Sequence, residues 1–232
     1  MVPRISAPFL LAFLALAGCA GPEAKRAIGK KKPAYSKQHN KQKPRRPGPQ
    51  LAQTDPDIKQ CLADLGAAKV RYSSLPDRDF GGGCSATGSV QLLDIGTPVT
   101  NLGAMKCPLA RTFAAWAHYA VRPAARQILG SEVVRIETMG TYSCRNIVGG
   151  SSGKLSQHAL SNAVDVSAFL LADGRRIAIK GGWNGGSSSE RKFLKTIHDS
   201  ACKRFQIVLS PDYNSAHHDH MHFDMGRGPF CK

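Results

Sequence analysis

The strongest limit on how this chain can fold comes from two short stretches that lie far apart along it. The first, SQHALSNAVDV at 156–166, holds one histidine and one aspartate, and the second, HHDHMHFDM at 217–225, holds four of the eight histidines. A carboxylate among Ala and Val is costly to bury unless it is paired or binds a metal ion. We therefore expect the fold to bring these stretches together as two halves of one metal site.

Both stretches contain runs that are typical of β-strands. In HMHFDM, at 220–225, every second residue is polar, so a strand would turn its polar side chains to one face and its apolar side chains into the core. Asp165 lies between Val164 and Val166, which would point the opposite way. One carboxylate oxygen and two imidazole nitrogens from separate segments would leave a fourth tetrahedral position for water, as in catalytic zinc sites. We expect His217 and His218 to be solvated loop residues.

The first residues predict export and a lipid anchor. Arg4 precedes the apolar run FLLAFLALAGCAG, which is too short for a stable membrane span and has the length of a signal-peptide core. The run ends in LAGC at 16–19, which resembles a bacterial lipobox, so residues 1–19 would form a lipoprotein signal peptide ending at the lipidated Cys19. The alternative is an ordinary cleaved signal with an incidental cysteine. Ala20 replaces the Asp that favours inner-membrane retention, which indicates a periplasmic lipoprotein of the outer membrane.

Residues 20–54 have the composition of a disordered tether. The segment 25–50 alone holds ten Lys or Arg and four Pro, with no periodic apolar face. The tether accounts for more than half of the formal charge of +16, and it would be drawn to anionic surfaces if it is not simply a solvated spacer. We expect no nucleic-acid partner, because the export signal argues against one and the folded part is only mildly basic.

Residues 55–232 have a globular composition and suffice for one domain. Helical patterns occupy 55–67, 107–121 and 187–205, and strand patterns occupy 132–139, 162–171, 175–181, 205–210 and 220–225. Pro123 should end or kink the second helix. Because helices come first and strands cluster later, we predict a single α+β domain, a monomer, with a mainly antiparallel sheet flanked by helices.

Six of the seven cysteines fall in this globular part, and none of them forms a CxxC motif. A thiolate zinc site is therefore not expected, and the even number in an exported protein predicts three disulfides. Cys202–Cys231 is one candidate pair, which would fix the end of the chain beside the His-rich stretch. His198 lies on a predicted helix and shows no case for ligation. The GGWNGG segment at 181–186 is either a flexible rim of the site or a plain Gly-rich loop.

The first motif resembles a known signature. SQHALSNAVD, with Ser156, His158, Ala163 and Asp165 at the matching positions, resembles the SxHxxGxAxD signature of LAS-type zinc peptidases. That group contains D-Ala-D-Ala dipeptidases and carboxypeptidases and the penicillin-insensitive murein endopeptidases. Ser161 departs from the signature, which has Gly there.

The second motif extends the resemblance. Asp219-His220-x-His222 is similar to the DHxH of the murein endopeptidases. The region from about Cys61 to Cys231 resembles the bacterial extensin-like C-terminal domain, with YSCR at 142–145 ahead of the metal motif. The resemblance implies an LAS-type fold and one zinc ion held by His158, Asp165 and His222. Ser156 would steady His158 or Asp165.

Three further residues gain implied roles. Asp219 and His220 are the two candidates for the general base, and the sequence does not rank them. Arg145 is suited to a substrate carboxylate or to a developing oxyanion.

These roles lead to two functional hypotheses. The first is a zinc-dependent peptidase that cleaves peptidoglycan stem peptides or cross-links, anchored in the membrane through Cys19. The second is a non-catalytic lipoprotein of the cell wall that keeps the metal-binding domain.

Overall fold

The computed structural model describes residues 55–148 and 153–232. The predicted signal peptide, Cys19 and the tether at 20–54 lie outside the described residues. The described chain folds into helices and sheets within one compact domain, which confirms the predicted α+β class. In 55–148 and 153–232 no helix is long and apolar enough to cross a membrane.

A six-stranded sheet carries most of the predicted strands. The strand order is β11-β9-β10-β7-β6, with β8 paired to β7. The strands are β6 (Val133–Gly140), β7 (Ala163–Leu171), β8 (Arg176–Ala178), β9 (Ile207–Leu209), β10 (Met221–Asp224) and β11 (Phe230–Cys231). Every pairing is antiparallel except that of β11 with β9, so the predicted mainly antiparallel sheet is confirmed.

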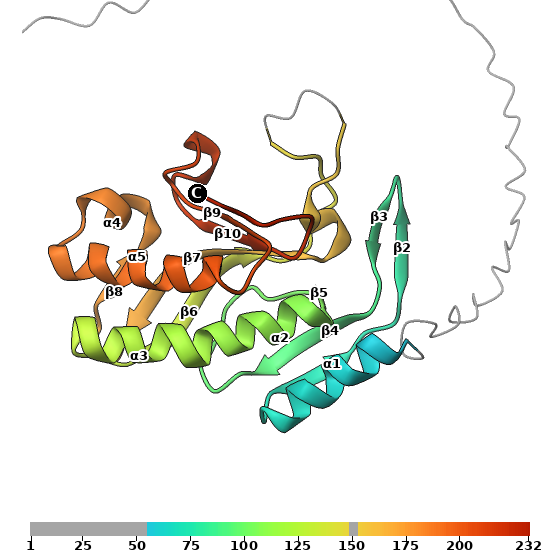
Figure 1. The fold of residues 1–232 in the computed structure, drawn as a ribbon, viewed down its shortest axis with the longest axis horizontal. Helices are drawn as coiled ribbons and strands as arrows, with labels where there is room; N and C mark the ends of the chain where they lie inside the picture. Colours follow the sequence, from blue (N-terminus) through green and yellow to red (C-terminus); the bar gives the residue numbers. More distant parts are fainter. Residues whose placement is uncertain (1–54, 149–152) are drawn as a thin grey trace, which may run out of the picture. The chain divides into compact units, whose positions relative to one another are not determined.

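Aromatic side chains fix the helices to one face of this sheet. The helix α5 (Ser188–Cys202) runs alongside the helical segments at 117–129 that continue α2 (Cys107–Trp116) (Figure 1). The ring of Trp116 lies 5.0 Å from that of Phe223 in β10 and 6.2 Å from that of Phe169 in β7, measured between centroids. Its indole N–H donates to the carbonyl of Ile197 in α5 at 2.9 Å. Burial of these rings is the main force holding the layers together.

The register of β10 against β7 separates the core from the polar face. Phe223 pairs with Val164, and His222 pairs with Asp165. Met221 and Phe223 are fully buried in the core, as the alternation predicted. Because paired residues share a face, Asp165 and His222 both lie on the face opposite the helices.

Pro123 does not end the second helix, although an end there was one of the two outcomes predicted for it. The helical path continues from α2 through the π-helix η2 (Ala117–Val121), α3 (Arg122–Ala124) and the π-helix η3 (Ala125–Leu129). A π turn shifts the hydrogen-bond pattern by one residue, which makes room for the proline ring and its missing N–H. The helix ends instead at Gly130, which has a φ of 68° and forms a left-handed cap.

Short strands between the first two helices were not predicted. α1 (Pro56–Ala67) begins with an Asp55 cap and is followed by β1 (Arg71–Ser74), β2 (Arg78–Gly81), β3 (Cys84–Ala86), β4 (Ser89–Asp94) and β5 (Met105–Lys106). They form a three-stranded sheet, β1-β4-β5, and the hairpin β2-β3. β2 is wholly exposed and most of β1 is too, so both lack the apolar alternation that identifies a strand in a sequence.

The three predicted disulfides are present, including the candidate pair. Cys61–Cys107 joins α1 to α2, Cys84–Cys144 joins β3 to the segment after β6, and Cys202–Cys231 joins α5 to β11. The last two disulfides therefore attach the segment after β6 and the edge strand β11 to other parts of the domain.

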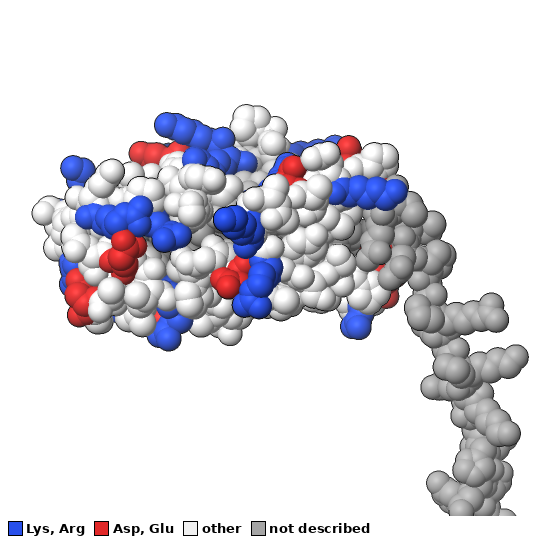
Figure 2. Space-filling model, turned by 90° about the horizontal axis from the view of Figure 1, so that it is seen from below, with Lys and Arg blue, Asp and Glu red and all other residues white. Residues whose placement is uncertain are grey.

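Charged side chains are dispersed over the domain. Several basic groups pair with acidic ones, such as Arg111 with Asp64 and Arg126 with Glu132. On the face shown in Figure 2, Lys and Arg residues of the described chain form no continuous basic patch.

Phe223 should be essential for stability. We expect Phe223→Ala to lower the free energy of unfolding by about 3–5 kcal/mol, because it removes a fully buried ring between the sheet and α2. The matched control is Phe80→Ala in β2, because Phe80 is 48% exposed and loss of its ring should cost below about 1 kcal/mol. Urea unfolding would measure both, and equal losses would contradict this packing.

Candidate metal centre

The structure brings together the three residues expected to bind zinc. Asp165 and His222 lie opposite each other on β7 and β10, with Oδ1 and Nδ1 2.9 Å apart. His158 comes from the 3₁₀-helix η4 (Gln157–Leu160), and its Nε2 lies 3.1 Å from Oδ2 of Asp165 and 3.2 Å from Nδ1 of His222. All three side chains are buried, and their donor atoms lie within 4.8 Å of one another. We call these three residues the metal centre.

Hydrogen bonds behind the metal centre orient both imidazoles. Nδ1 of His158 lies 3.0 Å from the carbonyl oxygen of Thr141, which can only accept, so Nδ1 carries the proton and Nε2 is left to bind an ion. Nε2 of His222 lies 2.9 Å from Oδ2 of Asp224, whose Oδ1 accepts from the N–H of Gly226 at 2.7 Å. This carboxylate leaves Nδ1 of His222 facing the other two donors.

Ser156 and Ser161 shape the segment that presents His158. The hydroxyl oxygen of Ser156 accepts a hydrogen bond from the backbone N–H of His158 at 3.3 Å and caps η4. Ser161 ends η4 with a φ of 54°, in the left-handed region where the LAS signature has Gly. Ser161 therefore adopts a conformation that is commoner for Gly.

The charges of the centre are strongly coupled. Burial opposes ionisation of Asp165, but its hydrogen bonds with His158 and His222 outweigh this, so the pKa of Asp165 lies far below its usual value. Burial likewise disfavours a charged His222, yet hydrogen bonds with Asp165 and Asp224 raise the pKa of His222 to about 9. Two carboxylates thus draw a proton onto His222. A divalent cation, which binds in competition with protons, would balance the same charges.

A cleft of about 620 Å³ adjoins the metal centre, and His222 is the metal-centre residue that lines it among the described residues. His220 and His222 line it, and the segment at 154–157 forms part of its wall. Its walls combine cationic and apolar side chains, among them Arg145, Lys154, Arg227, Ile147, Tyr213 and Phe230. Such a lining suits a ligand that carries negative charge beside apolar groups.

The remaining predicted site residues occupy different places. His220 lines the cleft, and its Nε2 lies 3.7 Å from Oδ1 of Asp165. Asp219 lies behind it, with Oδ1 2.9 Å from Nδ1 of His220, and this hydrogen bond lowers the pKa of Asp219. Arg145 also lines the cleft, with Nη2 3.9 Å from Oδ2 of Asp165.

Two expectations about the surroundings were wrong. His217 is half-buried in the cleft wall, with its ring 5.1 Å from that of His220, and burial lowers the pKa of His217 to about 4. GGWNGG forms no rim, because it belongs to the helical segment α4 (Ile179–Gly185), in which Trp183 is only 2% exposed.

Two residues that orient the imidazoles of the metal centre could not be identified as such from the sequence. Asp224 shares the strand face of His222, but alternation gave it no role. Thr141 contributes a backbone carbonyl, which every residue has.

Asp224 should set the metal affinity. We expect Asp224→Asn to weaken zinc binding about 10–100-fold, because the amide can no longer hold Nε2 of His222 with a charged acceptor. Competition with a chromophoric chelator would measure the affinity. The control is Asp173→Asn, which also replaces a carboxylate by an amide but lies exposed in the turn after β7, and it should leave the zinc affinity unchanged. Equal zinc affinities in the two variants would contradict the role of Asp224.

Comparison with known families assigns the described domain to one family. No curated protein and no solved structure matches the chain. The family described as extensin-like protein C-terminus matches residues 59–232, which include all three disulfides and the metal centre. The chain therefore belongs to the extensin-like protein C-terminus family.

Proposed function

We propose that this protein is a zinc-dependent peptidase that cleaves peptidoglycan stem peptides or their cross-links. The observation that carries the proposal is the metal centre itself, three buried donors that converge beside a cleft lined by one of them, His222. The resemblance of both motifs to those of LAS-type peptidases supports the same reaction class.

The donor set fits zinc. Two imidazole nitrogens and one carboxylate oxygen are ligands that zinc accepts, and a three-residue set is typical of catalytic rather than structural sites. Zinc bound by His158, Asp165 and His222 would supply Lewis acidity toward a carbonyl oxygen and would lower the pKa of a water molecule. The buried position of the donors keeps bulk water away from the charged groups.

His220 is placed to move the proton. Its Nε2 faces the metal centre, while Nδ1 is held by Asp219. Asp219 thereby fixes the tautomer in which Nε2 accepts a proton from the attacking water and delivers it to the leaving amine. This arrangement favours His220 over Asp219 as the base, with Asp219 acting through it.

The cleft suits a peptide that carries free carboxylates. Arg145 lies next to the metal centre, where its guanidinium can bind a substrate carboxylate or a developing oxyanion. Lys154 and Arg227 add positive charge farther along the walls. Peptidoglycan stem peptides offer such carboxylates, and they lie within reach of a lipoprotein attached through Cys19.

Digestion of purified cell wall tests the activity. We expect the full-length protein to release smaller muropeptides, to lose this activity with a chelator and to regain it with added zinc, as seen by mass spectrometry. An unchanged muropeptide profile from protein with a full complement of zinc would overturn the enzyme and favour the alternative, a wall-associated binding protein.

Separate variants should divide metal binding from turnover. We expect His158→Ala to lose zinc, because it removes one of three ligands. His220→Ala should keep zinc and lose about 10²–10⁴-fold in turnover, because it removes the proton acceptor. Asp219→Ala should also keep zinc and lose turnover. The control is His118→Ala, an exposed imidazole on η2, and equal zinc loss in the His158 and His220 variants would contradict the assigned roles.

A further inference from the structure

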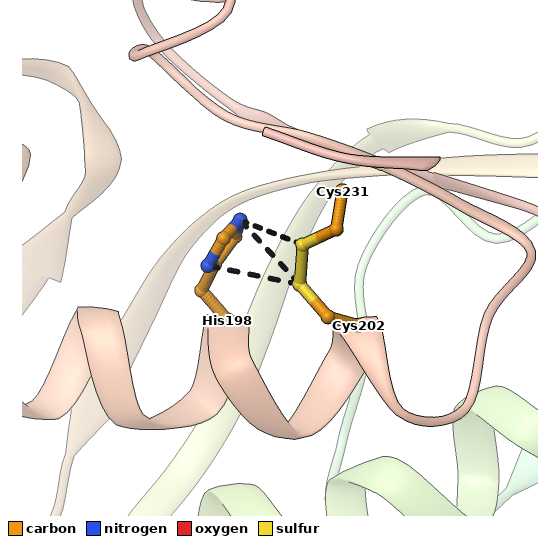
Figure 3. Close-up of side chains that lie close together, drawn as sticks. All are labelled: His198, Cys202 and Cys231. Atoms are coloured by element: carbon orange, nitrogen blue, oxygen red, sulfur yellow. Dashed lines mark hydrogen bonds between the residues drawn. A yellow bond between two sulfur atoms is a disulfide. The ribbon is translucent and has the colours of Figure 1, made fainter. Parts of the chain in front are cut away.

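A second group of metal-ligating side chains lies outside the cleft. His198 and Cys202 are four residues apart on α5, so they share one face of the helix, and Cys231 on β11 lies against them (Figure 3). One nitrogen and the two sulfur atoms lie within 4.8 Å of one another. In the structure the two cysteines form a disulfide.

The imidazole of His198 is directed at both sulfur atoms. Its Nε2 lies 3.8 Å from Sγ of Cys202 and 3.8 Å from Sγ of Cys231. Its Nδ1 lies 3.4 Å from Oδ1 of Asp199, a carboxylate acceptor that favours a proton on Nδ1 and a free Nε2. The side chain of His198 is 11% exposed, and its ring meets that of Trp183 edge-on at 5.3 Å between centroids, which limits its rotation.

We propose that His198, Cys202 and Cys231 form a second, redox-controlled site for a thiophilic divalent cation such as Zn²⁺. In the oxidised protein the disulfide occupies the two sulfur atoms. A dithiol reductant transfers two electrons and two protons to this bond and becomes a disulfide itself, which leaves two thiols. The cation then displaces both thiol protons and binds two thiolates and Nε2 of His198.

The distances from Nε2 of His198 to the two sulfur atoms already suit such a site. In tetrahedral zinc coordination with bonds of about 2.0–2.1 Å to nitrogen and about 2.3 Å to sulfur, the nitrogen and sulfur ligands lie about 3.6 Å apart. Both Nε2–Sγ distances of 3.8 Å are close to that value before any movement. Two thiolates on one zinc ion lie about 3.8 Å apart, so the two sulfur atoms must separate once the disulfide is reduced. Cys231 is exposed on the edge strand β11, where solvent can supply water as a fourth ligand.

The ion would take over the link that the disulfide makes. Both the disulfide and the bonds from the two thiolates to the ion join α5 to β11. Phe230, next to Cys231, lines the cleft beside the metal centre. Reduction with zinc present would therefore keep the side-chain link between α5 and β11, whereas reduction without zinc would leave β11 held by its backbone pairing with β9. This inference does not rest on the proposed peptidase activity.

Cobalt substitution tests the second site. The full-length protein is titrated with Co²⁺ before and after reduction with a phosphine, and thiolate-to-cobalt charge-transfer absorption is recorded. We expect this band in the reduced protein alone, and we expect it to be lost in Cys202→Ser/Cys231→Ser and in His198→Ala. His118→Ala, which removes an exposed histidine elsewhere, should retain it.

Two precautions keep the test decisive. His198→Gln preserves side-chain bulk in case His198→Ala does not fold, and circular dichroism of each oxidised variant checks the fold. The inference is overturned if the reduced protein shows no band, or if the band persists in the folded His198 variants or in the double Ser variant. Co²⁺ that binds to the oxidised protein without the charge-transfer band reports on the metal centre of His158, Asp165 and His222. Failure of the second site can therefore be distinguished from failure of the proposed peptidase site.

Discussion

The contact on which this structure depends is the cross-strand pair of Asp165 and His222. A buried carboxylate is stable here only because two imidazoles surround it, and one of them is fixed by the strand ladder. A slip of one residue in this ladder would turn Asp165 into the core and Val164 toward the cleft. The same strand register therefore sets both the packing of the core and the geometry of the metal centre. Burial of Phe223 in the core holds the neighbouring His222 in place.

Much of the architecture was predictable because side chains report it directly. The alternation in β10 predicted which residues enter the core, and the isolated Asp165 indicated that it needed partners. The even number of cysteines predicted three disulfides, and Cys202–Cys231 was among the candidate pairs. The family resemblance then selected His158 from among the histidines as the third donor.

What escaped prediction depends on tertiary contacts or on the backbone. Pro123 normally interrupts a helix, but π turns on either side of it accommodate the ring. The many glycines around Trp183 indicated a loop, although the indole is buried against α5. The carbonyl of Thr141 orients His158 through an atom that all residues share. His217 appeared to be a solvated residue because nothing local shows that Tyr213 and His220 flank its ring.

The shape of the cleft depends on when the Cys84–Cys144 disulfide forms. Cys144 directly precedes Arg145, so the bond to β3 restrains the backbone that carries the guanidinium beside Asp165. A newly made chain with free thiols lacks this restraint. The wall that carries Arg145 is consequently completed only when the two thiols are oxidised after synthesis, so the finished shape of the cleft depends on a covalent step that follows translation.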